Sequence, residues 1–205
     1  MRFIAFDLET TGFVAGVDQI VVIGAVRFVD GQVESVFATL IDPQISVPEA
    51  ASRVNGITDL MLKGQPKIDA ILDPFAQFCG DDLLVAHNAP FDCQFMTADY
   101  KKFEMTAPRG LVLDTCAMAR NIFRGLANYK LGTLVQYLQI EAAGFHRAEA
   151  DANYCGQLFH KMHTRLADSN SHSLESMIKL TSKPEFRFPI IERKPKQMGF
   201  LDMLI

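Results

Sequence analysis

The segment Arg2–Leu8 most constrains the fold of this chain, because it is a nearly continuous apolar run that leads into acidic residues. Runs of this kind are typical of a central strand that is buried on both faces of a layered α/β domain. The run contains Asp7 and is followed by Glu9 and by the turn residues Thr10-Thr11-Gly12. The sequence therefore predicts a buried strand that carries two carboxylates at its C-terminal end.

Two further apolar runs, 20–29 and 33–41, are joined by Asp30-Gly31, a dipeptide that is typical of hairpin turns. The first three strands are therefore predicted to form an antiparallel meander, and short strands are predicted at 83–86 and 111–113. Asn88 and Asp114 are interpreted as caps of the helices that follow them. Helices are predicted at about 47–54, 59–63, 67–78, 90–103, 115–123, 130–139 and 148–167.

The chain of 205 residues is predicted to contain one α/β domain, residues 1–168, and a flexible, extended C-terminal tail, residues 169–205. A Ser/Asn-rich loop at 169–173 marks the boundary, and three later prolines interrupt a basic stretch without periodicity. An apolar content of 49% and a charged content of 21% exclude wholesale disorder.

Composition also indicates where such a chain works. The longest clean apolar run, Ile20–Val26, is far shorter than the roughly 20 residues that span a bilayer. Asp7 follows the N-terminus too closely for a secretory signal, and the four cysteines form no CxxC pair. We therefore predict a cytoplasmic protein with reduced thiols and no membrane partner.

The net charge of −4 argues against passive electrostatic binding of nucleic acid. It is compatible with an enzyme that binds phosphodiesters through metal ions held by carboxylates.

Asp7 and Glu9 are two residues apart on the first strand, so their side chains point to the same face. Two carboxylates at the end of a buried strand are costly unless a cation lies between them, and Mg²⁺ prefers oxygen ligands. The alternative is a pair of solvated acids at a strand terminus.

Asp151 lies on the buried side of the helix predicted at 148–167, where a metal ion shared with Asp7 would give it a partner. Five residues earlier stands His146, a candidate general base, because histidine is the side chain that most often accepts and donates protons near neutral pH. Asp92 lies in the first turn of another predicted helix and, by itself, only complements the helix dipole.

Three segments resemble the exonuclease motifs of the DEDDh family: residues 6–12, 87–92 and 146–152. The family includes the proofreading subunits of bacterial DNA polymerase III, oligoribonuclease and ribonuclease T. The resemblance covers about residues 1–168, and three motifs in this order are highly specific. His146, separated from Asp151 by four residues, marks the histidine branch of the family.

This resemblance implies an RNase H-like fold with a five-stranded mixed sheet flanked by helices. It implies that four acids bind two Mg²⁺ or Mn²⁺ ions and that His146 accepts a proton from the attacking water. The four acids are Asp7, Glu9, Asp92 and Asp151. The expected activity is metal-dependent 3′→5′ hydrolysis of DNA, which releases 5′-mononucleotides from single-stranded 3′ ends during proofreading or repair.

The family pattern also implies substrate contacts. Residues 55–58 resemble a loop that places an apolar wedge against the terminal bases. The residues expected to surround the terminal nucleotide are Leu8, Thr10, Thr11, Gly12, Asn55, Ile57, Asn88, Phe91 and His146. Ordinary core packing is an equally good interpretation of Ile57 and Phe91. Asp114 is interpreted as a helix cap rather than as a fifth ligand.

Two other functions remain open at this point. An exoribonuclease that trims RNA would use the same motifs, because the choice between DNA and RNA depends on contacts to the 2′-hydroxyl. A catalytically silent nucleic-acid-binding module would keep the fold, although the complete set of acids argues against it.

The tail contains Gln197-Met198-Gly199-Phe200-Leu201, which is similar to the pentapeptide that binds the bacterial sliding clamp. Phe200 and Leu201 stand in reversed order relative to the usual pattern. The alternative is that these apolar residues pack against the domain itself or against a polymerase subunit.

Overall fold

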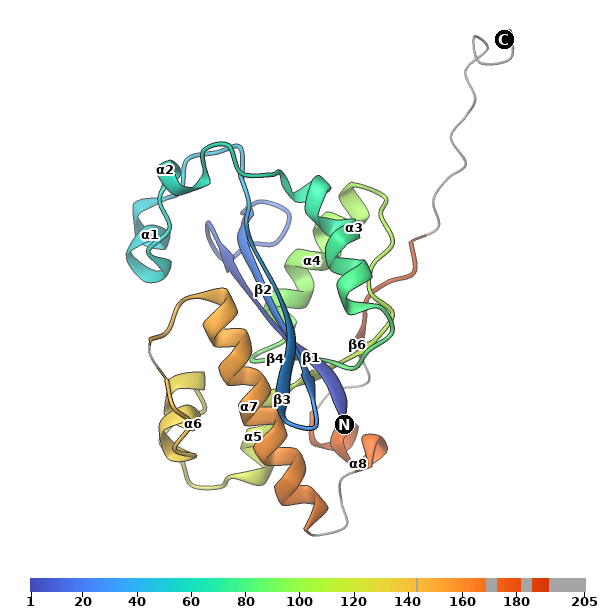
Figure 1. Cartoon of the computed structure of the whole chain (residues 1–205). Helices are drawn as coiled ribbons and strands as arrows, with labels where there is room; N and C mark the ends of the chain where they lie inside the picture. Colours follow the sequence, from blue (N-terminus) through green and yellow to red (C-terminus); the bar gives the residue numbers. More distant parts are fainter. Residues whose placement is uncertain (143, 169–172, 182–185, 192–205) are drawn as a thin grey trace, which may run out of the picture.

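The fold is taken from a computed structural model, which describes residues 1–142, 144–168, 173–181 and 186–191 (Figure 1). Its centre is a six-stranded mixed sheet with the strand order β3-β2-β1-β4-β5-β6. The strands are β1 (Arg2–Thr10), β2 (Ile20–Val29), β3 (Gln32–Leu40), β4 (Leu84–Ala86), β5 (Leu111–Asp114) and β6 (Phe186–Arg187). The predicted RNase H-like α/β class is confirmed, and β6 adds a two-residue strand to the five that were expected.

The predicted antiparallel meander is confirmed. β1 pairs antiparallel with β2, which pairs antiparallel with β3, whereas β1 and β4 are parallel. At the hairpin between β2 and β3, Asp30 and Gly31 have φ values of 49° and 82°. Both residues therefore adopt the positive φ that a tight two-residue hairpin requires.

The helices are α1 (Glu49–Asn55), α2 (Asp59–Leu62), α3 (Ile68–Cys79), α4 (Pro90–Lys102), α5 (Thr115–Ile122), α6 (Leu131–Tyr137), α7 (Ala148–Ala167) and α8 (Leu174–Leu180). α3 and α4 pack on one face of the sheet, and α5 to α8 pack on the other (Figure 1). Along β1, Phe6 and Leu8 belong to the first core, and Phe3 and Ala5 belong to the second. This alternation is the period of two expected for a strand buried on both faces.

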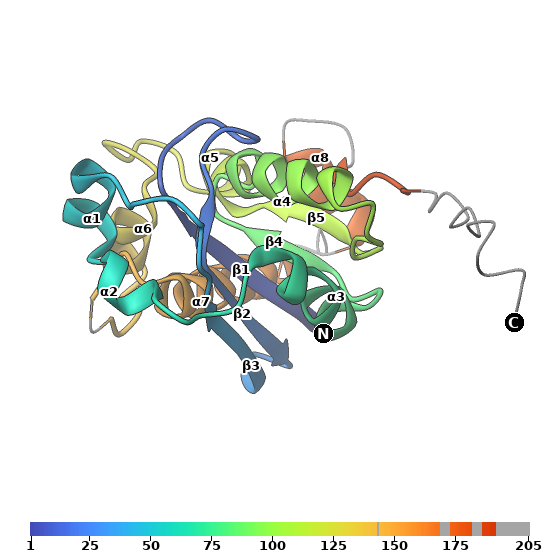
Figure 2. The ribbon, with the colours of Figure 1, turned by 90° about the horizontal axis from the view of Figure 1, so that it is seen from above.

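α1 and α2 form an arm beyond the end of the sheet, beside the start of α7 (Figures 1 and 2). The arm is attached through a small separate cluster in which Ile57 and Leu62 pack against Val21 of β2. Across the described part of the chain, no helix is both long and apolar enough to cross a membrane.

The cap predicted at Asn88 is wrong. The N-cap of α4 is Ala89, with no side-chain cap hydrogen bond, and Pro90 occupies the first turn. Asn88 instead has a φ of 65°, and its N–H donates to Asp114 Oδ1 over 3.0 Å. Asp114 also accepts the N–H of Cys116, which confirms its predicted role as the cap of α5.

Part of the stretch predicted to be an extended tail is folded. α8 buries Met177 in the second core, and β6 pairs antiparallel with β5, beside the buried Phe188. The predicted clamp-binding segment, which includes Gln197, Met198, Phe200 and Leu201, lies outside the described residues.

Two glycines let α7 lie unusually close to the sheet. A Cβ at Gly24 of β2 would stand 2.2 Å from the Ala148 carbonyl carbon, at the start of α7. Farther along the helix, a Cβ at Gly156 would stand 2.1 Å from the Phe28 ring. Gly24 is the partner of Asp7 in the β1–β2 register, so this close approach brings the first turn of α7 next to Asp7.

Candidate active site

Three of the predicted acids meet at the C-terminal end of β1. Asp7 and Glu9 lie on one face of the strand, and Asp151 reaches them from the first turn of α7. Carboxylate oxygens from the three residues all lie within 4.8 Å of one another. This spacing, in a group of hard oxygen donors, suits a divalent cation such as Mg²⁺ or Mn²⁺.

The electrostatics of this group also favour a cation. No Lys, Arg or His side chain of the described residues forms an ion pair with these three acids. Burial, followed by repulsion from Asp92 and Glu9, raises the pKa of Asp7 well above its ordinary value. Burial and the charge of Asp151 raise the pKa of Glu9 to about 7. The charge of His146 acts on Asp151, but burial has the larger effect and raises the pKa of this acid as well. The protein therefore supplies a crowded, partly desolvated negative site.

The two carboxylate oxygens of Asp151 differ in their hydrogen bonding. Its Oδ2 accepts the backbone N–H of His146 over 2.8 Å. Its Oδ1 is buried and has no hydrogen-bond partner among the described residues. A buried carboxylate oxygen without a partner is costly, and a metal ion at this position would remove that cost. The residues present therefore fit a bound divalent cation.

Asp92, the fourth predicted acid, is placed differently. It is 3% exposed, in the first turn of α4, and its Oδ1 accepts the N–H of Leu8 over 3.1 Å. Burial raises the pKa of Asp92 to about 8, against the opposing effect of its backbone hydrogen bonds. Asp92 is outside the close group of three found among the described residues, but its charge contributes to the raised pKa of Asp7. α4 therefore holds it against the backbone that links Asp7 to Glu9.

His146 lies in the exposed loop that leads into α7. Its φ of 62° is unusual for a residue with a side chain, and such conformations persist where surrounding contacts hold them. The hydrogen bond to Asp151 is one such contact, so the same carboxylate links the acidic group to the candidate base.

A cleft of about 780 Å³ runs from these residues toward the arm. Its walls include Glu9, the arm residues Asn55 and Ile57, and the loop residues Phe145 and His146. Glu9 is the member of the acidic group that lines this cleft, so a chain terminus in the cleft would reach the group at Glu9.

Asn55 and Ile57, which were expected to contact substrate, are both mostly buried at 8% exposure. The Asn55 side chain accepts the N–H of Ile57 over 3.0 Å and donates to the Thr10 carbonyl over 3.4 Å. It also lowers the pKa of Glu9, against the larger effect of burial. The structure thus shows Asn55 as a link between the arm and β1, and Ile57 both as part of a small core and as a wall of the cleft.

The turn after Glu9 is held by its own side chains. Thr10 Oγ1 donates to the Gly12 carbonyl over 2.6 Å, and Thr11 Oγ1 accepts the Gln19 N–H over 2.9 Å. Thr11 and Leu8 are 3% and 5% exposed, so the interior covers most of their surface. Gly12 has no room for a Cβ, which would stand 2.4 Å from Asp18.

Aromatic residues surround this turn. Phe91 is half-buried and packs against Phe95, with ring centroids 5.0 Å apart, while Asn88 is exposed. Phe13, which sequence reasoning missed, is 86% exposed and meets Phe91 edge-on at 6.4 Å. Phe145 was also missed, and the only sequence signals were an apolar residue directly after the Thr-Thr-Gly turn and another directly before His146.

The family model described as "Exonuclease" matches residues 4–159. The DNA polymerase III subunit epsilon of Treponema pallidum is 40% identical over 174 residues, which are 84% of this chain and 81% of the relative. The DNA polymerase III PolC-type protein of Caldanaerobacter subterraneus subsp. tengcongensis is 33% identical over 212 residues, which are 100% of this chain. The chain spans only 15% of the length of that relative.

Solved structures share the fold. Exonuclease X in complex with 5′ overhanging duplex DNA has a TM-score of 0.69 at 24% identity and covers 88% of this chain and 98% of its own. Escherichia coli Exonuclease I in complex with a dT13 oligonucleotide has a TM-score of 0.70 at 16% identity. The match covers 87% of this chain and 45% of the Exonuclease I chain. The family match, the relatives and the three motifs agree, and this chain therefore belongs to the exonuclease family, in the DEDDh group that its motifs resemble.

Proposed function

We propose that the chain is a divalent-metal-dependent 3′→5′ exonuclease that releases 5′-mononucleotides from DNA 3′ ends, in proofreading or repair. The observation that carries this proposal is the partnerless Oδ1 of Asp151, in a group of three carboxylates of which Glu9 lines a cleft. Membership of the exonuclease family supports the same reaction class.

In this proposal, two Mg²⁺ or Mn²⁺ ions would be held by four acids, namely Asp7, Glu9 and Asp151 of the close group and the neighbouring Asp92. Bound cations lower the pKa of the attacking water and stabilise the negative charge that develops on the leaving 3′ oxygen. Mg²⁺ is our first choice, since all four side chains are carboxylates and Mg²⁺ takes oxygen ligands almost exclusively.

The residues of the chain supply orientation and proton transfer. His146 accepts the proton of the attacking water. Asp151 holds His146 in place by accepting its backbone N–H. The arm, with Ile57 in the cleft wall, and the aromatic residues Phe91 and Phe13 receive the terminal bases by apolar contact and stacking. Leu8, Thr10, Thr11 and Gly12 shape the pocket for the terminal sugar through the turn that they form.

DNA is the proposed substrate because the named relatives are DNA polymerase III proteins. RNA trimming is the second candidate, since the acids and His146 would act on either phosphodiester. A silent binding module is disfavoured, because binding nucleic acid does not require buried acids that repel one another. The raised pKa values of Asp7 and Glu9 show that these two acids are placed in that way.

The test uses three labelled substrates: single-stranded DNA, duplex DNA with a mismatched 3′ end, and single-stranded RNA. We expect stepwise loss of nucleotides from the 3′ end of DNA in Mg²⁺ or Mn²⁺, with 5′-mononucleotides as products and no reaction in EDTA. Loss of nucleotides from the 5′ end, or full digestion by the metal-stripped protein, would contradict the proposal. Faster degradation of RNA than of DNA would identify RNA as the substrate, and the proposed metal-dependent chemistry would still hold.

We further propose that the protein acts in the cytoplasm at replication ends and that Gln197–Leu201 tethers it to a sliding clamp or a polymerase subunit. Tethering would raise the effective concentration of the enzyme at primer ends. A pull-down with the clamp of the host would compare the full chain with a chain truncated after Lys196. Equal binding by both chains, or binding by neither, would remove the clamp from the proposal.

A further inference from the structure

The loop that carries His146 has few contacts with the rest of the fold. Every described residue between Glu141 and Arg147 is exposed, and Gly144 has a φ of 154°. The charge of His146 acts on Asp151, and the hydrogen bond between these two residues comes from the His146 backbone N–H rather than from its ring. A charge interaction does not fix a loop in one conformation, so further contacts must hold this loop in place.

Two contacts fix the loop beside the acids. The first is the hydrogen bond from the His146 N–H to Asp151 Oδ2, over 2.8 Å. The second is the ring of Phe145, which packs on Tyr154 of α7 with centroids 5.3 Å apart and an interplanar angle of 58°. A Cβ at Gly132 of α6 would stand 3.5 Å from the same ring, so Phe145 also lies against α6.

Phe145 is therefore placed between two helices, although it is part of an exposed loop. It is 39% exposed, its ring packs on the buried Tyr154, and the ring also faces α6 at Gly132. Aromatic pairs contribute stability beyond the area that they bury. This contribution offsets part of the entropy that the loop loses when it is held in one conformation.

We propose that Phe145 is a positioning residue, whose ring anchors the His146 loop to α6 and α7 and thereby holds His146 at the acidic group. This inference rests on the proposed function, because it assumes that His146 is the general base. Phe145 acts through its neighbour: without the ring, His146 is still present but is rarely in place. Misplacing a reacting group by about 1 Å can lower a rate by about 10²-fold.

The decisive test is a double-mutant cycle with Phe145→Ala and His146→Ala, assayed on single-stranded DNA in Mn²⁺. We expect Phe145→Ala to lower kcat by about 10²-fold, with KM within about 3-fold of wild type. In the His146→Ala background, the same change should lower kcat by less than about 2-fold, because the group that Phe145 positions is gone. Phe145→Tyr, which keeps the ring, should restore most of the rate.

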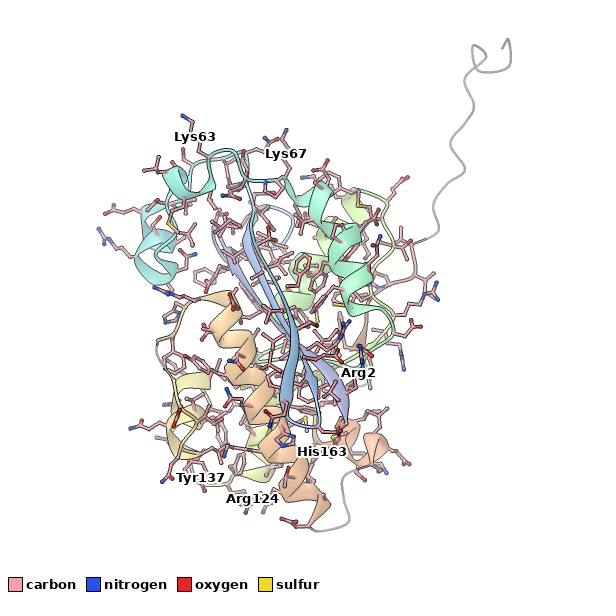
Figure 3. The ribbon with its side chains drawn as sticks, viewed as in Figure 1. Arg2, Lys63, Lys67, Arg124, Tyr137 and His163 are labelled. Atoms are coloured by element: carbon pink, nitrogen blue, oxygen red, sulfur yellow. The ribbon has the colours of Figure 1, made fainter. Side chains whose placement is uncertain are left out.

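Tyr137→Ala is the matched control. Tyr137 of α6 is 52% exposed and packs edge-on against the buried Phe123 at 5.6 Å, so this change also removes a half-exposed ring that packs on a buried aromatic residue. Tyr137 points outward at the far end of the molecule from Lys63 and Lys67, away from the cleft that the arm borders (Figure 3). We expect the kcat of this variant to stay within about 2-fold of wild type, and the thermal midpoints of both aromatic variants show that each is folded.

The outcomes separate the two ideas. An equal loss of kcat on adding Phe145→Ala with or without His146, or a loss confined to KM, would overturn the positioning role and leave the proposed function standing. A normal rate for Phe145→Ala would have the same meaning. A normal rate for His146→Ala would overturn both the proposed base and the inference that depends on it.

Discussion

The acids and the base of the candidate site are held in opposite ways. Asp7, Glu9 and Asp151 project from β1 and α7, the strand and helix at the centre of the packed domain. His146 projects from an exposed loop with two anchoring contacts. Local stability differs in the same way, since packed elements open rarely and exposed loops open often. Metal affinity is therefore expected to follow the rigid framework, and turnover is expected to follow the loop.

The most damaging change to the framework is Asp7→Ala. It removes the central carboxylate of the group, and bound metal supplies several kcal/mol of transition-state stabilisation. We expect kcat/KM on single-stranded DNA to fall by about 10³-fold or more, with Mn²⁺ binding in calorimetry lost in parallel. A variant that kept its function would instead favour the silent binding module.

The equivalent change to the loop is His146→Ala. Loss of a positioned general base lowers kcat by roughly 10²–10⁴-fold. His160→Ala serves as the control, because it removes a histidine at the far part of α7, beside the turn at Gly31. Steady-state rates should leave the control within about 2-fold of wild type, and a similar loss in both variants would mean that the effect is not specific to the loop.

Gly24→Ala tests the framework without touching an acid. The added Cβ would meet the Ala148 backbone at 2.2 Å, so the first turn of α7 must move away from Asp7. We expect a loss of about 1–3 kcal/mol in the free energy of unfolding and weaker Mn²⁺ binding. Gly156→Ala clashes with Phe28 instead, farther along the helix, and should lower stability while leaving Mn²⁺ affinity near that of wild type.

The smallest expected effect is a gain in stability. The pKa of Glu9 is raised to about 7 from the ordinary value of 4.5, mainly by burial, so the folded state prefers the protonated form. The stability contributed by this group is complete below pH 4.5 and is lost as the pH rises through about 7. In EDTA at pH 8, Glu9→Gln should therefore raise the free energy of unfolding by about 1–2 kcal/mol after allowance for solvent screening.

Urea unfolding at pH 4 and pH 8 measures this difference. The gain should be small at pH 4 and should disappear at pH 8 when saturating Mg²⁺ stabilises the wild type. A gain that is independent of pH and of metal would contradict the idea that burial and the charge of Asp151 destabilise the ionised form of Glu9.

Most of the fold could be predicted from local patterns. β2 and α7 have the predicted bounds, because a largely apolar run of ten residues and an apolar stripe along a twenty-residue helix are long enough to specify one structure. α8 and β6 were missed because seven and two residues carry too little periodicity. Their positions depend on tertiary contacts, such as the burial of Met177 and the pairing of Arg187 with Leu111.

The features of the candidate site also differ in whether the local sequence could predict them. The pairing of Asp7 with Glu9 follows from the alternation of a strand, and the inward direction of Asp151 follows from the helix stripe. The backbone contact of Asp92 with Leu8, the φ of His146 and the packing of Phe145 on Tyr154 depend on residues distant in sequence or on backbone torsions. These features require the three-dimensional structure.

One titration tests whether the rigid acids bind the metal while a separately held histidine supplies the turnover. Single-turnover cleavage of DNA is measured against Mn²⁺ concentration for the wild type and for His146→Ala. We predict the same half-saturating Mn²⁺ concentration for both proteins, with a plateau rate lower by roughly 10²–10⁴-fold in the variant. A shifted half-saturation with an unchanged plateau would place His146 among the metal ligands and contradict the account.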